Sequence, residues 1–307
     1  MAKSGRRRAS EHGQHHHGSG DERRVFAAML LTGGFMVVEL VGGIVAGSLA
    51  LIADAGHMMA DAAALALAWF AFRLARRPAD RRRSYGYGRF QVLVAFANGL
   101  TLIALAVWIV AEAIGRLVEP VAVRGGVMMG VAVAGLLVNV VAFAVLHGGN
   151  RENLNMRGAT LHVMGDLLGS AAAIVAALVI LTTGWTPIDP LLSVLVALLI
   201  VRSAWFLVRA SGHILLEGAP AEIDLEDLKT SLPAAVPGVE DVHHLHAWSL
   251  TQDRPLVTLH ARIVGHADPD DALRRIHSFL AEEYGVGHAT VQLETGACAD
   301  GPAAPKP

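Results

Sequence analysis

Apolar residues gather along the chain into six long stretches, separated by short polar connections. Each stretch is close to the roughly 20 residues that an α-helix needs to cross about 30 Å of hydrocarbon. The expected membrane-spanning helices lie at residues 25–46, 49–73, 90–116, 125–147, 158–182 and 188–210. Helix-breaking residues such as Pro78, Pro120 and Pro187 occur in the connections. An even number of spans places both ends of this region on the same side of a membrane.

After residue 210 the pattern changes to that of a small soluble domain. Helices are expected at Ile223–Leu232, with a stop at Pro233, and at Pro269–Tyr284. Period-two alternation predicts strands at Val239–Leu250, Leu256–Val264 and Ala289–Glu294. This αββαβ order favours an α+β domain, with a small antiparallel or mixed sheet and helices on one face.

Four parts follow from these patterns: a polar tail at 1–24, a six-span membrane domain at 25–210, a soluble domain at 211–296 and a second tail at 297–307. Both tails contain too little apolar material to fold, so we expect them to be disordered. The first tail carries four histidines, namely His12, His15, His16 and His17.

Composition supports a membrane protein and narrows the chemistry. The chain has 53% apolar and 17% charged residues, with a mean hydropathy of +0.47. A net charge of −2 gives no basic field for nucleic-acid binding. The single cysteine, Cys298, excludes an intramolecular disulfide and a cluster of thiolates. We therefore expect nitrogen and oxygen atoms to hold any metal.

Arginine residues are concentrated in the connections on one side of the expected spans. That side carries Arg73, Arg76, Arg77, Arg81, Arg82, Arg83, Arg89, Arg151 and Arg157. The opposite connections offer little beyond Arg116 and Arg124. Because basic loops stay in the cytoplasm, we predict that the N-terminus, the C-terminus and the soluble domain are cytoplasmic.

Two spans contain the same pair of ionisable residues at the same spacing. His57 and Asp61 lie in span 2, and His162 and Asp166 lie in span 5. Residues four apart share a helix face, about 6 Å apart along the axis. On antiparallel helices, His57 would lie level with Asp166, and Asp61 with His162. Two imidazoles and two carboxylates suit tetrahedral Zn²⁺, and the carboxylates offset its charge.

Other readings of the polar residues in the spans remain open. A His–Asp pair within one span is often a hydrogen bond between helices. Asp54 shares the face of His57 and Asp61, and is either an outer waypoint for the ion or an interfacial acid. Glu39 and Asn139 are interpreted as hydrogen-bonding neighbours of the site instead of ligands.

Five runs of residues are distinctive, namely SLALIADAGHMMAD (48–61), YGYGRFQVL (85–93), NLNMRGATLHVMGDLLGS (153–170), VHHLHAWSL (242–250) and HATVQLE (288–294). Together they resemble the cation diffusion facilitator family, and most closely its bacterial zinc exporter branch. The resemblance covers residues from about 25 to 296. It implies a homodimeric zinc/proton antiporter of the bacterial inner membrane, with a six-helix membrane domain and a cytoplasmic ferredoxin-like domain.

The resemblance also assigns residues. It places His57, Asp61, His162 and Asp166 at the transport-site positions of the family. It further implies a regulatory or structural zinc site at His243, His260, His288 and Glu294 in the soluble domain, which could bridge a dimer.

Three histidine-rich or loop regions need separate interpretation. In a regular strand, His244 and His246 would share one face and His243 the other, and spacing favours neither set. The N-terminal histidines resemble metal-collecting tails of this family, although a run of three is also close to an engineered tag. Gln91 stands where family members often have a glutamate, so we predict no zinc site between spans 2 and 3.

The predicted function is export of Zn²⁺, or of Cd²⁺ or Co²⁺, by exchange with protons, and not an enzymatic reaction. Histidine binds either a proton or a metal through the same nitrogen, and the chain lacks a nucleotide-binding P-loop. Having His57 in place of a second aspartate favours zinc over cadmium. The alternatives are a membrane-anchored zinc sensor and an intramembrane metalloprotease, although the latter lacks an H-E-x-x-H sequence.

Overall fold

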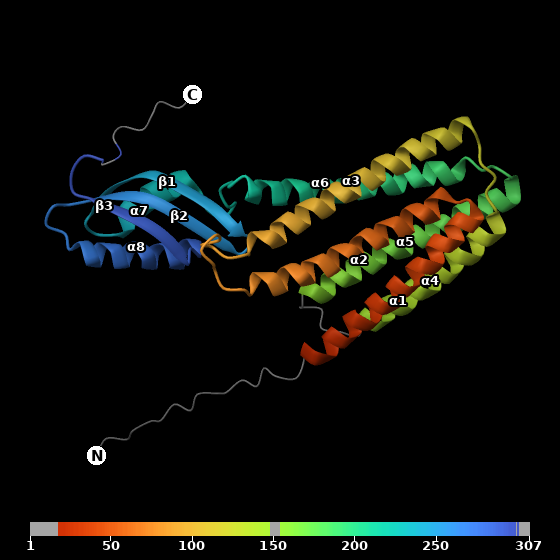
Figure 1. Cartoon of the computed structure of the whole chain (residues 1–307), viewed down its shortest axis with the longest axis horizontal. Coiled ribbons are helices and arrows are strands. Elements are labelled where there is room, and N and C mark those ends of the chain that lie inside the picture. The colour runs from red at the N-terminus through yellow and green to blue at the C-terminus, as the bar shows by residue number, and fades with distance from the viewer. Residues whose placement is uncertain (1–17, 148–153, 299, 301–307) are drawn as a thin grey trace, which may run out of the picture. The chain divides into compact units, whose positions relative to one another are not determined.

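The computed structural model describes residues 18–147, 154–298 and 300 (Figure 1). Its membrane region contains α1 (Gly18–Ala46), α2 (Leu49–Ala75), α3 (Arg89–Val118), α4 (Gly125–His147), α5 (Leu154–Thr183) and α6 (Ile188–Leu215). These helices confirm the six spans predicted from the sequence. Each contains a segment long and apolar enough to cross a membrane, and the chain is therefore a multi-pass membrane protein.

Large apolar side chains cover the outer faces of these helices. Ile44 on α1, Leu168 on α5 and Phe206 on α6 are 63%, 70% and 75% exposed in the single chain. Exposed apolar side chains of this size occur on each of the six helices, and together they form a surface that the hydrocarbon of a bilayer would cover.

The described residues divide into two compact units, one within 18–62 and 102–202 without 148–153, and the other within 63–101 and 203–300 without 299. In the first unit, α4 packs against both α1 and α5 (Figure 1). Its core is rich in alanine, including Ala46, Ala50, Ala132, Ala173, Ala176 and Ala177. Small residues let helices approach closely, and Gly42 of α1 lies directly against Val131 of α4.

A buried carboxylate fixes the start of α2. Asp189, in the first turn of α6, is fully buried and accepts hydrogen bonds from the Ser48 hydroxyl at 2.5 Å and the Leu49 N–H at 2.7 Å. The Ala50 N–H donates to the same carboxylate at 3.3 Å. The guanidinium of Arg116 lies 4.0 Å away. Asp189 therefore supplies the acceptors that the first turn of α2 lacks within its own backbone.

The connection between α2 and α3 is organised around Asp80. Its carboxylate accepts hydrogen bonds from the Tyr87 hydroxyl at 2.8 Å and from the N–H groups of Arg82 and Arg83 at 2.7 and 2.8 Å. These hydrogen bonds, the Tyr87 bond first, lower the pKa of Asp80. The guanidinium of Arg83 also lies over the Tyr87 ring, 4.7 Å from its centre. Tyr87 thus stabilises the turn that begins α3.

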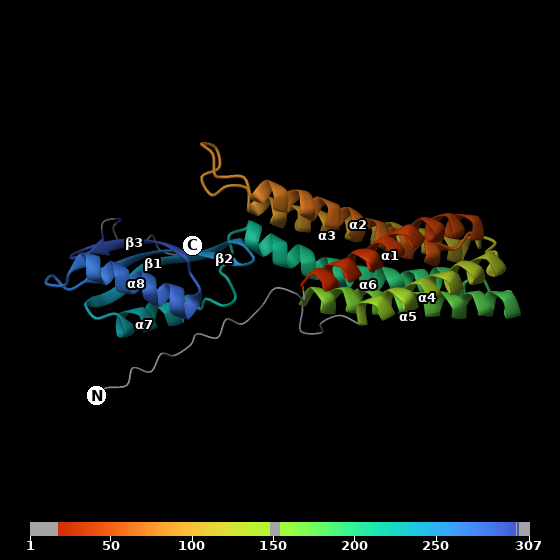
Figure 2. The same cartoon turned by 90° about the horizontal axis from the view of Figure 1, so that it is seen from below.

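The C-terminal domain contains α7 (Leu225–Ala235), β1 (Val239–Thr251), β2 (Arg254–Ile263), α8 (Pro269–Tyr284) and β3 (His288–Glu294). The strands form one sheet in the order β1-β2-β3, with β1 antiparallel and β3 parallel to β2. Both helices lie on one face of the sheet (Figure 2). Leu228, Leu232, Ile276 and Leu280 fill the core between them and the strands. The predicted αββαβ order and mixed sheet are confirmed.

Both helices of this domain begin at an aspartate cap. Asp224 accepts from the Glu226 N–H at 2.9 Å, and Asp268 accepts from the Asp270 N–H at 3.0 Å. The predicted stop at Pro233 is too early, since α7 continues to Ala235. A proline near the end of a helix has a compatible φ angle, and its missing N–H interrupts only one bond.

Candidate metal centres

Polar side chains are buried within the apolar membrane helices of the first unit. Glu39 of α1, Asn139 of α4, Asp166 of α5 and Ser170 of α5 are each less than 7% exposed. The Asn139 amide donates a hydrogen bond of 3.3 Å to the Ser170 hydroxyl. Because burying such groups in hydrocarbon is costly, their presence marks this region for function.

The polar face of α2 lies within the same unit. His57 Nε2 is 3.6 Å from Asp61 Oδ2, so the i,i+4 pair does share one helix face. The two side chains are 24% and 29% exposed. Asp54 lies on this face one turn before His57, and its carboxylate faces Gly169 of α5. A Cβ placed on Gly169 would lie 3.6 Å from Asp54 Oδ2.

That contact sets the relative register of α2 and α5. The two helices are antiparallel, and three residues beyond Asp54 on α2 correspond to three residues before Gly169 on α5. Since both helices rise by about 1.5 Å per residue, His57 lies at the level of Asp166. By the same spacing, position 162 lies at the level of Asp61. The side chain of His162 is outside the described residues.

A further carboxyl group adjoins this face. Glu39 of α1 lies close enough to Asp54 and Asp166 to interact with both carboxyl groups electrostatically. The described residues of the bundle therefore bring four carboxyl groups, Glu39 on α1, Asp54 and Asp61 on α2 and Asp166 on α5, near the level of His57. This arrangement can bind cations, protons included.

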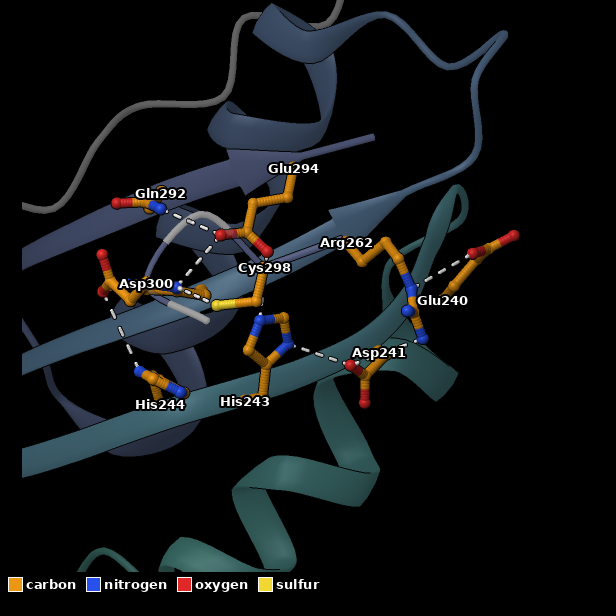
Figure 3. Close-up of polar contacts among 10 residues, drawn as sticks. Glu240, Asp241, His243, His244, Arg262, Gln292, Glu294, Cys298 and Asp300 are labelled. Carbon is orange, nitrogen blue, oxygen red and sulfur yellow. Dashed lines mark hydrogen bonds and ion pairs between the residues drawn. The ribbon is translucent and has the colours of Figure 1, made fainter. Parts of the chain in front are cut away.

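A second group of possible metal ligands lies on the sheet of the C-terminal domain (Figure 3). His243 Nε2 lies 3.1 Å from Glu294 Oε2, and His260 Nδ1 lies 3.2 Å from Glu294 Oε1. The Cys298 sulfur lies 3.6 Å from His260 Nδ1. One donor atom of each residue lies within 4.8 Å of those of the other three. The Glu294 side chain is 6% exposed.

The four residues predicted for this site are not all together. His243, His260 and Glu294 converge, but the structure does not bring His288 to them. His288 pairs with Leu256 in the β2–β3 register, four residues before His260 and thus about 13 Å along the strand. Its ring packs edge-on against the Tyr85 ring, with centres 6.3 Å apart.

A β-bulge overturns the expected alternation of the histidines on β1. The pairing register shifts between His243 and His246, and His244 has a φ angle of +47°. A bulge turns successive side chains toward the same face. His243 and His244 consequently both contact the His260 ring, with centres 5.5 and 4.9 Å apart. Only a few per cent of residues other than glycine adopt a positive φ, and here one lies beside the ligand group.

Neighbouring polar residues orient this group. Asp241 Oδ2 lies 2.9 Å from His243 Nδ1. An Nδ1–H that donates to Asp241 leaves the Nε2 lone pair directed at Glu294. The Gln292 amide donates to Glu294 Oε1 at 2.9 Å. These contacts fix the orientation of the His243 ring and of the Glu294 carboxylate.

Sequence reasoning missed two residues near this group, Cys298 and Asp300. Asp300 Oδ2 lies 3.5 Å from His260 Nε2 and 3.9 Å from His244 Nδ1. Both residues fall in the tail that was predicted to be disordered from residue 297. The sequence did offer one indication of their role, since both residues follow the predicted ligand Glu294 within six positions. The N-terminal histidines, His12 and His15 to His17, lie outside the described residues.

These features define a polytopic membrane protein that combines buried polar residues in its helices with a C-terminal domain that carries a cluster of possible metal ligands. The chain matches the cation efflux transmembrane domain over residues 25–216 and the cytoplasmic domain of cation efflux proteins over residues 220–296. It therefore belongs to the cation efflux family and is a transporter, not an enzyme.

Individual relatives share most of its length. The zinc transporter ZitB of Pectobacterium atrosepticum is 49% identical over 94% of this chain and 90% of its own length. A cadmium, cobalt and zinc/H(+)-K(+) antiporter of Bacillus velezensis is 38% identical over 93% of this chain and 92% of its own. The solved metal-bound C-terminal domain of the CzcD transporter from Cuprividus metallidurans is 30% identical in sequence. The match covers 24% of this chain and 99% of that domain, and its TM-score is 0.22.

Proposed function

We propose that this chain exports Zn²⁺ from the cytoplasm in exchange for protons, through a tetrahedral site formed by His57, Asp61, His162 and Asp166. The register of α2 and α5 is the observation that carries the proposal. It supports the proposal because, with Asp54 opposite Gly169 and a rise of about 1.5 Å per residue, positions 57 and 166 and positions 61 and 162 would lie at matching levels. The names of the relatives, a zinc transporter and a cadmium, cobalt and zinc/H(+)-K(+) antiporter, agree with export of a divalent metal ion. Cd²⁺ and Co²⁺ are alternative substrates, since they accept similar ligands.

Exchange follows from the chemistry of the ligands. An imidazole binds zinc only through a neutral nitrogen, so a bound proton and a bound Zn²⁺ compete for the same lone pair. The carboxyl groups of Glu39 and Asp54 lie close to each other beside the proposed site and offer further positions for a proton. Entry of protons from outside then favours release of the metal there, and the inward proton gradient drives export.

Zinc flux into proteoliposomes under an imposed pH gradient tests this site directly. Asp61→Ala is expected to abolish gradient-driven flux, because one of four ligands and one compensating charge are lost. Asp271→Ala removes an exposed carboxylate on α8 and serves as the matched control, with flux like that of the unchanged chain. Gradient-driven flux that survives in Asp61→Ala would refute the assignment. Competition by Cd²⁺ and Co²⁺ in the same vesicles defines the selectivity.

The C-terminal domain is proposed to hold a resident Zn²⁺ through His243, His260 and Glu294. Two imidazole nitrogens and a buried carboxylate are a donor set that zinc accepts, and all three point at one another. A bound ion would supply structural cross-linking of the three strands. His260→Ala should lower the zinc content of the purified protein by one ion per chain. Unchanged zinc content would remove His260 from the site.

The domain is also proposed to join two copies of the chain, as a homodimer with both termini in the cytoplasm of a bacterium. The arginine-rich connections support this orientation. Light scattering in detergent should give a protein mass of about twice 32.3 kDa. Fluorescent protein fused to the C-terminus should fluoresce inside the cell, and periplasmic reporters fused there should be inactive.

A further inference from the structure

The segment after β3 returns to the sheet and brings a sulfur to the proposed metal. Cys298 is the only cysteine of the chain, and it lies four residues beyond Glu294. Figure 3 draws Cys298 beside Glu294 and His243, and its sulfur lies 3.6 Å from His260 Nδ1. Asp300, two residues further on, faces the opposite nitrogen of His260. The segment thus places one donor on each side of the same ring.

The distances suit a shared tetrahedral ion. With bonds of about 2.05 Å to nitrogen and 2.3 Å to sulfur, a tetrahedral ion sets those two atoms about 3.6 Å apart. The Cys298 sulfur and His260 Nδ1 are 3.6 Å apart. Nitrogen and oxygen ligands would be about 3.4 Å apart by the same calculation. The observed distances are 3.1 Å from His243 Nε2 to Glu294 Oε2 and 3.2 Å from His260 Nδ1 to Glu294 Oε1, so the two imidazoles face different oxygens of the same carboxylate. One donor atom from each of His243, His260, Glu294 and Cys298 lies within 4.8 Å of the other three.

The surroundings of Cys298 differ from those of a cysteine that only fills space in a core. Buried cysteines usually pack as small apolar residues. This sulfur is partly exposed and faces imidazole nitrogens and a carboxylate, which are themselves ligand atoms. Three different strands supply those ligands, so their common direction does not result from one stretch of sequence.

We propose that Cys298 is the fourth ligand of the resident ion, and that metal binding holds the segment after β3 against the sheet. This inference rests on the proposed metal site of the C-terminal domain. A thiolate ligand makes that site prefer the thiophilic ions Zn²⁺ and Cd²⁺ over Co²⁺ more strongly than the nitrogen and oxygen ligands of the membrane site do. The bound ion also occupies the sulfur electron pairs that would attack an alkylating reagent.

The single cysteine makes the thiol a direct reporter in the full-length protein. Iodoacetamide labelling is measured by mass spectrometry with and without metal, and Cd²⁺ binding is followed by thiolate-to-metal charge-transfer absorbance in the ultraviolet. At about ten times its dissociation constant, Zn²⁺ should slow labelling about tenfold, because only the metal-free fraction reacts. Cys298→Ser should abolish the Cd²⁺ absorbance band and weaken Cd²⁺ binding more than Zn²⁺ binding.

Two variants separate this site from others. His260→Ala should remove the protection of the thiol by Zn²⁺, whereas His57→Ala, at the membrane site, should leave it intact. If His260→Ala lowers the zinc content but Zn²⁺ never protects Cys298 and Cd²⁺ gives no thiolate band, the ligand role of Cys298 is overturned and the metal site stands. If His260→Ala leaves the zinc content unchanged and Zn²⁺ does not protect the thiol, both proposals are overturned. Protection that survives in His260→Ala would also overturn the shared site.

Discussion

The buried carboxylate of Asp189 is expected to be a main support of the site-bearing helix α2. Asp189→Ala removes the acceptor of the Ser48 hydroxyl and of the Leu49 and Ala50 N–H groups. Each buried donor left without an acceptor costs about 1–3 kcal/mol. The Ser48 hydroxyl can rotate toward another acceptor, so the two N–H groups dominate. The expected loss in free energy of unfolding is about 3 kcal/mol.

Unfolding in mixed micelles of a mild detergent and increasing SDS, followed by tryptophan fluorescence, measures this loss. Asp189→Asn keeps one acceptor oxygen but turns an NH₂ group toward a donor. Its free energy of unfolding should therefore lie between those of Asp189→Ala and the unchanged chain. Asp253→Ala removes an exposed carboxylate from the β1–β2 turn and should have no effect. If Asp189→Ala unfolds at the same SDS fraction as the unchanged chain, water or other groups replace the carboxylate, and its capping role is refuted.

Three further changes have defined outcomes. Gly42→Leu should destabilise the bundle by about 1–3 kcal/mol through overpacking against α4, whereas Gly34→Leu, which has open space, should not, and the same SDS titration compares them. Asp241→Ala should weaken zinc binding by the C-terminal domain about 10–100-fold, since it orients the His243 ring; a competing chelator measures this, and equal affinity would contradict it. Burial raises the pKa of Tyr284, so its stabilising contribution should persist below about pH 10 and decline as the pH rises through the raised value; denaturation of Tyr284→Phe should lack this decline.

The membrane helices and the shared helix face of His57 and Asp61 could be predicted because their determinants are local. A run of about 20 apolar residues in a membrane must form a helix, since only a helix satisfies its backbone within the segment. The i,i+4 pairs, such as His57 with Asp61, follow from helix geometry alone. The register that sets His57 level with Asp166 agrees with the level expected from two antiparallel spans.

The features that sequence reasoning missed depend on distant contacts or irregular backbone. Asp189 caps a helix that begins 140 residues earlier, and nothing in its own neighbourhood indicates that contact. The position of His244 requires a bulge, whereas strand alternation assumes a regular ladder. Cys298 lies in a segment whose composition resembles a disordered tail, and only its return to the sheet brings it to His260.

The spacing of the two membrane pairs has a consequence for how the helices can move. If α5 slid along α2 by one helical turn, Asp61 would become level with Asp166, and His57 with Ser170. Two carboxylates would then face each other in a medium of low polarity, which is strongly unfavourable without a proton or a metal between them. The two pairs therefore disfavour sliding of α5 along α2, much as one buried polar residue fixes the alignment of the helices in a coiled coil. Opening of the site by tilting or rotating a helix keeps that alignment, whereas opening by sliding would lose it.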